Sequence, residues 1–312
     1  MRAYVIYNPT AGLWHASQRR LDEALAVLAG RGWGVTLCTA QGPEDVTVWA
    51  HAAYEAGCDA VIVAGGDGSL RQAADALAGT PVALGVLPCG TANVWAQELG
   101  LPLPRLGGGW LAQAARLLTE SDVRAIDLGR ANGRHFLLWA GVGLDAYVAA
   151  RVNPSWLKRA FGVPGYTLAA LIAALRFRGI QARLKLKQAT VAGQMLLVVV
   201  SNVQRYAGGV IRLDERARLD DGLLEAWAFQ GRDLRHALAH LWRVWTGRHW
   251  GAPGVWQGRL QRIVIEADPP ALVHLDGDPL LRTPVKIEVL PGGLRVLVPP
   301  QAAARLFTSP AA

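Results

Sequence analysis

Residues 60–69 read AVIVAGGDGS, and this stretch decides the fold of the first half of the chain. Its first five residues are apolar and run into glycines, which is typical of a short strand buried on both faces of a parallel sheet. The glycines let the backbone approach a ligand closely, and a helical pattern follows. Because backbone amides at a helix start favour phosphate oxygens, the stretch predicts a phosphate-binding loop. A tight turn with Asp67 as helix N-cap is the alternative.

The alternation of strand and helix continues outward on both sides of this stretch. Repeated strand–helix units favour a parallel sheet with helices on both faces, and we expect residues 1–128 to form such an α/β domain. Strand and helix patterns follow one another at 4–7, 21–28, 34–39, 45–56, 60–64, 70–77, 83–87 and 92–99.

Three loops rich in glycine and small polar residues follow the first, third and fourth of these strands, at 8–12, 65–69 and 89–93. In parallel sheets, ligands bind beyond the carboxyl ends of the strands, so we expect the three loops to converge on one site. Thr91 and Asn93 would contact phosphate, ribose or water there, although ordinary helix capping explains them equally well.

The pattern changes at about Leu128, after which strand patterns follow with few helices between them. We expect residues 129–312 to form a mostly antiparallel, β-sandwich-like domain with one or two inserted helices. The final strands, at 285–290 and 294–298, either close that sheet or return to the first domain, and the end of the tail after Pro300 is expected to be loosely ordered. The other strand patterns lie at 136–142, 183–187, 194–201, 223–229 and 260–265.

Composition favours a folded cytoplasmic protein. The chain is 52% hydrophobic and 18% charged, and its three cysteines are scattered, which is typical of reduced residues. The N-terminus has no basic leader followed by an apolar stretch and a cleavage site. The longest uninterrupted apolar candidate, at 166–175, has about half the ~20 residues that a membrane span needs.

The net charge of +8 is unevenly distributed. A surface of one sign attracts anionic partners, so an anionic surface of lipid headgroups or nucleic acid is one interpretation and an ordinary solvated face is the other. Residues 240–245 alternate aromatic and basic side chains, which suits a membrane interface or a helix whose tryptophans face the core. Residues 146–213 contain no Asp or Glu but hold Arg151, Lys158, Arg159, Arg176, Arg178, Arg183, Lys185, Lys187, Arg205 and Arg212.

Aspartates late in the chain offer further chemistry. Asp276 follows His274 in an Asp-Gly pattern that indicates either a hairpin turn or a base near a substrate hydroxyl, and we expect His274 to be packed or hydrogen-bonded. The sequence 220–222 is either a similar turn or an oxygen site for magnesium. The sequence 141–145 is half a dinucleotide fingerprint and is discounted. No Gly-Lys-Ser/Thr phosphate loop or Gly-x-Ser-x-Gly elbow occurs, which excludes P-loop and α/β-hydrolase mechanisms.

Taken in order, six motifs resemble the diacylglycerol kinase catalytic-domain family, which includes bacterial lipid kinases and sphingosine kinases. The resemblance extends from Asn8 to about Val298. It implies two domains with ATP bound in the cleft between them and a lipid hydroxyl as the acceptor. The motifs are NPTAG at 8–12, GGDGS at 65–69, GTAN at 90–93, DLG at 127–129, DDGL at 220–223 and DGD at 276–278.

The resemblance also assigns roles to residues. Asp276 matches the general base, and Asp221, with the backbone carbonyls of Arg218 and Leu223, matches a structural magnesium site. Asp67 and Asp127 would help to hold a catalytic magnesium ion through water. The implied ATP contacts are Asn8, Pro9, Thr10, Ala11, Gly12, Thr39, Gly66, Asp67, Gly68, Ser69, Leu70, Arg71, Gln72, Thr91 and Asn93.

The chain departs from the family pattern at several positions. Ser69 replaces threonine but keeps the hydroxyl, and Asp278 replaces a longer glutamate. Val94 stands where many members carry an aspartate, and a valine cannot ligate magnesium or its waters. Arg71 and Gln72 replace asparagine and glutamate.

We therefore predict a lipid kinase that uses ATP and Mg²⁺ and meets its substrate at the anionic inner membrane surface, with no nucleic-acid partner. An NAD kinase or phosphofructokinase-like enzyme is the alternative within enzymes, because those relatives use a similar Gly-Gly-Asp-Gly turn. A non-catalytic nucleotide or lipid sensor is the alternative from another class, and Val94 and Asp278 would favour it. The sequence names neither the lipid nor the oligomeric state and leaves a homodimer open.

Overall fold

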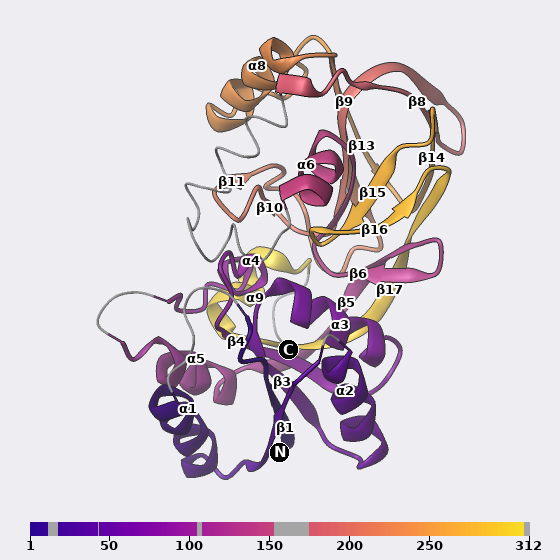
Figure 1. The fold of residues 1–312 in the computed structure, drawn as a ribbon. Helices are drawn as coiled ribbons and strands as arrows, with labels where there is room; N and C mark the ends of the chain where they lie inside the picture. Colours follow the sequence, from indigo (N-terminus) through magenta and orange to yellow (C-terminus); the bar gives the residue numbers. More distant parts are fainter. Residues whose placement is uncertain (12–17, 43, 105–107, 153–174, 309–312) are drawn as a thin grey trace.

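The computed structural model of the chain describes residues 1–11, 18–42, 44–104, 108–152 and 175–308. It confirms the predicted fold class, with a parallel α/β part at the N-terminus and a mostly antiparallel β-rich part after it (Figure 1). The two parts share one large mixed sheet within the described residues.

The N-terminal part is built on four parallel strands in the order β2-β1-β3-β4. Strands β3 and β4 are buried along their whole length, which is why their sequences are continuous apolar runs. Helices α1 and α5 cover one face and pack against each other, and α2 and α3 cover the other. The elements are β1 (Arg2–Tyr7), α1 (Gln18–Gly30), β2 (Gly34–Thr39), α2 (Asp45–Glu55), β3 (Ala60–Gly65), α3 (Asp67–Leu77), β4 (Ala83–Pro88), α4 (Val94–Glu98) and α5 (Trp110–Thr119).

The second part is an antiparallel array in the order β16-β15-β7-β9-β8-β14-β17, with β12 and β13 attached through β9. Among the residues that the structure describes, helices α6 and α8 are inserted between its strands. The elements are β6 (Arg134–Phe136), β7 (Trp139–Gly143), α6 (Leu144–Val152), β8 (Ile180–Lys185), β9 (Thr190–Ser201), β10 (Arg205–Tyr206), β11 (Ile211–Arg212), β12 (Leu224–Gln230), α8 (Leu234–Trp245), β13 (Val255–Leu260), β14 (Arg262–Asp268), β15 (Leu272–Leu275) and β16 (Asp278–Arg282).

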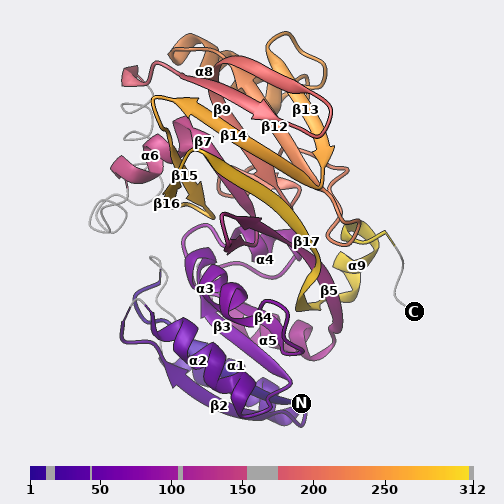
Figure 2. The same cartoon turned by 90° about the vertical axis from the view of Figure 1, so that its right-hand side faces the viewer.

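One long strand, β17 (Val285–Val298), joins the two parts. Its first half pairs with β14, and its second half pairs in parallel with β4, so the final strands both close the second sheet and return to the first (Figure 2). Strand β5 (Asp122–Ala131) runs antiparallel beside both halves, with a register shift between Leu290 and Leu294. The predicted boundary after residue 128 therefore falls inside β5.

Several predicted element boundaries were wrong. The strand expected at 136–142 is interrupted between β6 and β7, and the one expected at 260–265 straddles the tight connection from β13 to β14. Helix α5 was missed because its N-cap, Gly109, carries no capping side chain to mark a helix start. The tail begins with helix α9 (Pro300–Leu306), which buries Leu306, and its extreme end lies outside the described residues.

Much of the predicted apolar candidate at 166–175, together with Lys158 and Arg159, also lies outside the described residues. Among the helices that the structure describes, none is both long enough and apolar enough to cross a membrane. The three cysteines are free and buried, in agreement with the expectation that they are reduced.

Candidate functional site

The first two predicted loops meet at the carboxyl ends of β1 and β3. The Asn8 side chain donates through Nδ2 to Ser69 Oγ at 2.9 Å. Thr10 donates to Asn8 Oδ1 through its backbone N–H at 3.0 Å and through its hydroxyl at 2.8 Å. Asn8 thus holds its own loop in shape and ties it to the first turn of α3.

The second and third loops touch backbone to backbone at Gly66 and Gly90. A Cβ atom on Gly90 would lie 2.5 Å from Gly66 Cα, so the contact requires glycine. Asn93 fixes the third loop, since its Oδ1 accepts the Gly90 N–H and its Nδ2 donates to the Gly90 carbonyl, both at 2.7 Å. The predicted convergence of the three loops is confirmed. The Asn93 amide group, however, is engaged within its loop, which does not favour the predicted nucleotide contact.

Asp67 is the first residue of α3, but its carboxylate caps the neighbouring helix α4. Its Oδ2 accepts the Val94 N–H at 3.0 Å and its Oδ1 accepts the Trp95 N–H at 3.1 Å. The alternative that Asp67 is the N-cap of α3 was wrong, because Gly66 holds that position. Burial raises the pKa of Asp67, while hydrogen bonds from backbone N–H groups oppose the shift. The carboxylate thereby holds the second loop against the third.

The remaining predicted nucleotide contacts differ in what they can offer a ligand. Leu70 is 1% exposed in the core, and its N–H donates to the Gly66 carbonyl at 3.0 Å. Arg71 is also buried and meets a residue of the second part. Gly12 lies outside the described residues. Half-buried or exposed positions around the loops are Pro9, Ala11, Thr39, Gly68, Gln72 and Thr91.

Asp276 lies in the turn between β15 and β16, and three backbone N–H groups hold its carboxylate. Leu137 donates to Oδ2 at 2.8 Å, and Leu138 and Trp139 donate to Oδ1 at 2.9 Å each. These backbone N–H groups can bind the carboxylate because the chain leaves the β-sheet between β6 and β7. Burial raises the pKa of Asp276 to about 6, although the three hydrogen bonds and the charge of Arg71 lower it.

The turn that carries Asp276 reaches the N-terminal part through Asp278. Arg71 on α3 donates to Asp278 Oδ2 from Nε at 3.3 Å and from Nη2 at 3.2 Å. A Cβ atom on Gly68 would lie 4.0 Å from the same oxygen. The candidate base and the candidate phosphate loop therefore lie together where the two parts meet.

His274 stabilises this turn through hydrogen bonds at both of its ring nitrogens. It is buried, its Nε2 bonds Asp145 Oδ2 at 2.8 Å, and its Nδ1 accepts the Gly277 N–H at 3.1 Å. The expectation that His274 is hydrogen-bonded is confirmed. Asp145 was missed as a partner because the motif at 141–145 was discounted. The sequence feature that marks Asp145 is the strand ending on glycines just before it. Glycine is needed there because a Cβ atom on Gly141 would lie 2.2 Å from both Asp145 Oδ2 and His274 Nε2.

Asp127 and Asp67 have different partners. The Asp127 carboxylate accepts the N–H groups of Gly222 at 2.6 Å and Gly292 at 3.0 Å, and burial raises its pKa. Within the described part of the chain, no group of three or more His, Cys, Asp or Glu side chains is arranged to hold a metal ion. A magnesium ion shared by Asp67 and Asp127 stays a prediction.

The surroundings of Asp221 differ from the predicted magnesium site. Its Oδ1 accepts the Leu223 N–H at 3.1 Å, and its Oδ2 is paired with Arg259 Nη2. Arg259 also donates from Nε to Glu225 Oε1 at 3.2 Å. Burial and the nearby Asp214 raise the pKa of Glu225 to about 8. The positive charge beside these carboxylates is thus a guanidinium, an arrangement that does not fit a magnesium ion bound between Asp221 and the carbonyls of Arg218 and Leu223.

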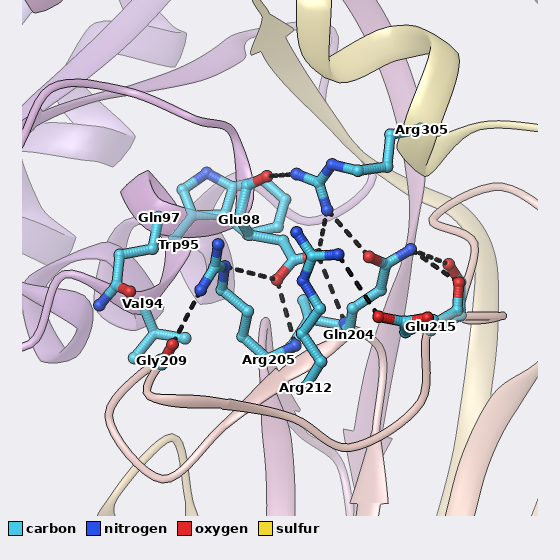
Figure 3. Close-up of polar contacts among 12 residues, drawn as sticks. Val94, Trp95, Gln97, Glu98, Gln204, Arg205, Gly209, Arg212, Glu215 and Arg305 are labelled. Carbon is cyan, nitrogen blue, oxygen red and sulfur yellow. Dashed lines mark hydrogen bonds and ion pairs between the residues drawn. The ribbon is translucent and has the colours of Figure 1, made fainter. Parts of the chain in front are cut away.

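A buried ionic network fastens the third loop to the rest of the molecule (Figure 3). Glu98, at the end of α4, is fully buried and lies between Arg205 of β10 and Arg305 of α9. Its Oε2 accepts the Arg205 N–H at 3.2 Å, and Arg305 also donates to Gln204 Oε1 at 2.9 Å. The β10 segment and helix α9 therefore both fix the helix that Asp67 caps.

Two surface hollows lie away from these loops. One of about 620 Å³ is lined by Met1, Asp59 and Arg295, at the opposite edge of the parallel sheet from the three loops. The other, of about 310 Å³, lies beside α8 and is lined by His236, His240 and Arg243. In α/β sheets ligands bind at the carboxyl ends of the strands, so we assign the candidate site to the loops.

Comparison with known proteins shows the family to which the chain belongs. The diacylglycerol kinase catalytic domain model matches residues 2–131, and the model of the YegS C-terminal NAD kinase beta sandwich-like domain matches residues 139–298. A Mycobacterium tuberculosis protein named "Diacylglycerol kinase" is 32% identical over 94% of this chain and 93% of its own length. A Pseudomonas aeruginosa protein named "Probable lipid kinase YegS-like" is 31% identical over 91% and 92%.

Solved structures share the fold. A crystal structure of a diacylglycerol kinase from Bacillus anthracis has a TM-score of 0.71 at 21% identity, covering 96% of this chain and 98% of that one. Another Bacillus anthracis structure of this kind has a TM-score of 0.81 at 23% identity and covers 96% of both chains. The predicted family is confirmed: the chain belongs to the diacylglycerol kinase catalytic-domain family, whose members are phosphotransferases with an alcohol group as acceptor.

Proposed function

We propose that the chain is an ATP-dependent lipid kinase that transfers the γ-phosphoryl group of ATP to a hydroxyl of diacylglycerol or a similar lipid. The observation that carries the proposal is the position of Asp276. Three backbone N–H groups hold its carboxylate, and the ion pair between Arg71 and Asp278 keeps its turn against the glycine loop. The candidate base and the candidate phosphate loop thus lie on opposite sides of one boundary.

In this proposal Asp276 accepts the proton of the lipid hydroxyl while the hydroxyl oxygen attacks the γ-phosphorus. The new P–O bond forms while the bond to the β-phosphate oxygen breaks and ADP leaves. With a pKa of about 6, Asp276 is mostly ionised at neutral pH and is a stronger base than an ordinary aspartate. Backbone amides of the glycine loops would bind the phosphates, and magnesium bound with the nucleotide would offset the charge of the transferring group.

The names of the relatives support a lipid as the acceptor, since the two described above are called "Diacylglycerol kinase" and "Probable lipid kinase YegS-like". Such an enzyme must reach a hydroxyl at the surface of a bilayer. We propose that it works at the cytoplasmic face of an anionic membrane without spanning it. The basic interval 146–213 supports this only in part, because Lys185 pairs with Glu266 and Arg205 with Glu98.

The test is incubation with labelled ATP and a panel of diacylglycerol, sphingoid bases, phosphatidylglycerol and NAD, followed by organic extraction. Label in the organic phase is the expected result. Label found only in NADP would overturn the lipid assignment in favour of an NAD kinase, and no transfer to any acceptor would favour a sensor.

The Asp276→Asn variant tests the base. A positioned general base typically contributes ~10²–10⁴-fold, so we expect turnover to fall at least ~100-fold. Asp268→Asn, at the exposed end of β14, is the matched control and should keep wild-type activity. Thermal unfolding must show that both variants are folded. Full activity of Asp276→Asn would refute the assignment.

A further inference from the structure

Helix α8 carries an apolar stripe on its outward face. It lies at the end of the second part that is remote from the parallel sheet (Figure 1). The stripe consists of Leu238, Leu241, Trp242 and Trp245, which are 50%, 54%, 57% and 67% exposed. Because these residues are spaced by three, one and three positions, they lie along one side of the helix. The opposite side buries His240 and Val244 against the protein.

The stripe is one continuous surface and not a set of scattered exposed residues. The rings of Trp242 and Trp245 lie 5.5 Å apart, centre to centre. Single exposed apolar side chains are common, but a contiguous patch of large ones usually marks an interaction site. The pattern at 240–245 also suits a helix whose tryptophans face the core, but Trp242 and Trp245 do not face it.

The charge around the stripe is positive. From Leu234 to Ile265 the sequence contains no Asp or Glu and five arginines. Arg235 and Arg248 are exposed, whereas Arg259 is already paired with Asp221 and Glu225. The neighbouring Asp233 is engaged as the N-cap of α8, where it accepts the His236 N–H. The hairpin of β10 and β11 belongs to the interval 146–213, which contains no Asp or Glu, and β11 contacts α8. Its tip residue Val210, which is 81% exposed, adds to the surface on this side of the protein.

We propose that the α8 surface, defined as Leu238, Leu241, Trp242 and Trp245 with Arg235 and Arg248, docks on an anionic lipid bilayer. An amphipathic helix with tryptophan and leucine on one face and arginine beside them lies in the plane of the membrane interface. The tryptophans enter the interface, and the arginines meet the lipid phosphates.

A second copy of the chain fits this surface less well. Two such helices related by a twofold axis would bring their arginines together, and four side chains bury little area compared with the ~800 Å² per partner of a stable interface. The inference rests on the proposed function, because a kinase of a bilayer lipid must be held at the bilayer surface.

Binding is measured first, by co-sedimentation of the full chain with vesicles. We expect binding to phosphatidylglycerol–phosphatidylethanolamine vesicles and much weaker binding to phosphatidylcholine vesicles. Trp242→Ser with Trp245→Ser should weaken binding at least tenfold. The matched control changes two exposed apolar residues of α2, Val48→Ser with Tyr54→Ser, and should bind as the wild type does. Arg235→Gln and Arg248→Gln should each weaken anionic binding about fivefold.

Activity is measured separately, on a short-chain diacylglycerol dissolved without vesicles. The tryptophan variant should keep wild-type turnover there and lose it only on vesicles. Undiminished vesicle binding by this variant, or no binding by the wild type, would overturn the docking surface. A concentration-dependent dimer that the variant abolishes, without vesicle binding, would identify a second copy as the occupant. Vesicle binding as predicted with no phosphorylation of any lipid would refute the proposed function and leave the docking surface standing.

Discussion

The Arg71 guanidinium on α3 donates twice to Asp278 Oδ2, at 3.3 and 3.2 Å, and so joins the helix after the glycine loop to the turn that carries Asp276. The family resemblance implies an asparagine in place of Arg71 and a glutamate in place of Asp278. The structure shows that the two departures meet, because a longer basic side chain reaches a shorter acid. The acid beside the candidate base is thus engaged in an ion pair between the two parts.

We expect Arg71→Ala and Asp278→Ala each to lower kcat/KM, because either change releases the turn that places Asp276. The kcat/KM of the double variant should be no lower than that of the less active single variant, since each single change already removes the same contact. The measurement is a double-mutant cycle on kcat/KM. The Lys185–Glu266 pair, which lies on β8 and β14, is the control and should show little coupling. Additive losses for Arg71 and Asp278 would contradict the shared role.

The activity should depend on pH through Asp276. A general base acts in its ionised form, and burial raises the pKa of this carboxyl to about 6. We therefore expect kcat/KM to be level above neutral pH and to fall about tenfold per pH unit well below pH 6. The measurement uses a dissolved short-chain lipid between pH 5 and 8.5. The Asp268→Asn control should follow the wild-type profile, and a rate independent of pH between 5 and 7 would count against Asp276.

Restoring the common aspartate at position 94 should harm this protein. The Val94 side chain is 2% exposed in the core, and only its backbone N–H meets Asp67. Val94→Asp would bury an unpaired charge, so we expect it to lower the free energy of unfolding by about 3 kcal/mol or more. Val94→Ala, which removes volume without adding charge, should cost about 2 kcal/mol. Urea unfolding distinguishes these values, and a Val94→Asp variant as stable as wild type would refute the prediction.

Magnesium without nucleotide should leave the wild-type Tm nearly unchanged, because Arg259 already neutralises Asp221. Arg259→Ala would leave Asp221 and Glu225 without that charge, and we expect its Tm to fall by several degrees, at about 2–4 °C per kcal/mol. Magnesium should then restore part of the loss. Arg262→Ala, at an exposed position on β14, is the control. A wild-type Tm that rises with magnesium, and does not rise in Asp221→Asn, would show that the metal displaces the arginine.

Local sequence patterns were enough to predict the parallel α/β part, the three glycine-rich loops and their convergence. They were enough because a buried strand must be apolar along its whole length and a loop of close backbone approach must contain glycine, and both requirements are visible in local sequence. The ordered motifs also determined the family. Local sequence did not reveal that β17 is a single strand, and it did not reveal helix α5. Nor did it reveal the interruption between β6 and β7 that leaves three backbone amides free to bind Asp276.

Which charges meet depends on how the chain folds in three dimensions. Arg71 and Asp278 are 207 residues apart, and Arg259 reaches Asp221 across 38 residues. Ion pairs and hydrogen bonds between such distant positions depend on where the sheet places each side chain, which no local pattern encodes. For the same reason, the alternation of aromatic and basic residues at 240–245 could not say whether the protein covers Trp242 and Trp245.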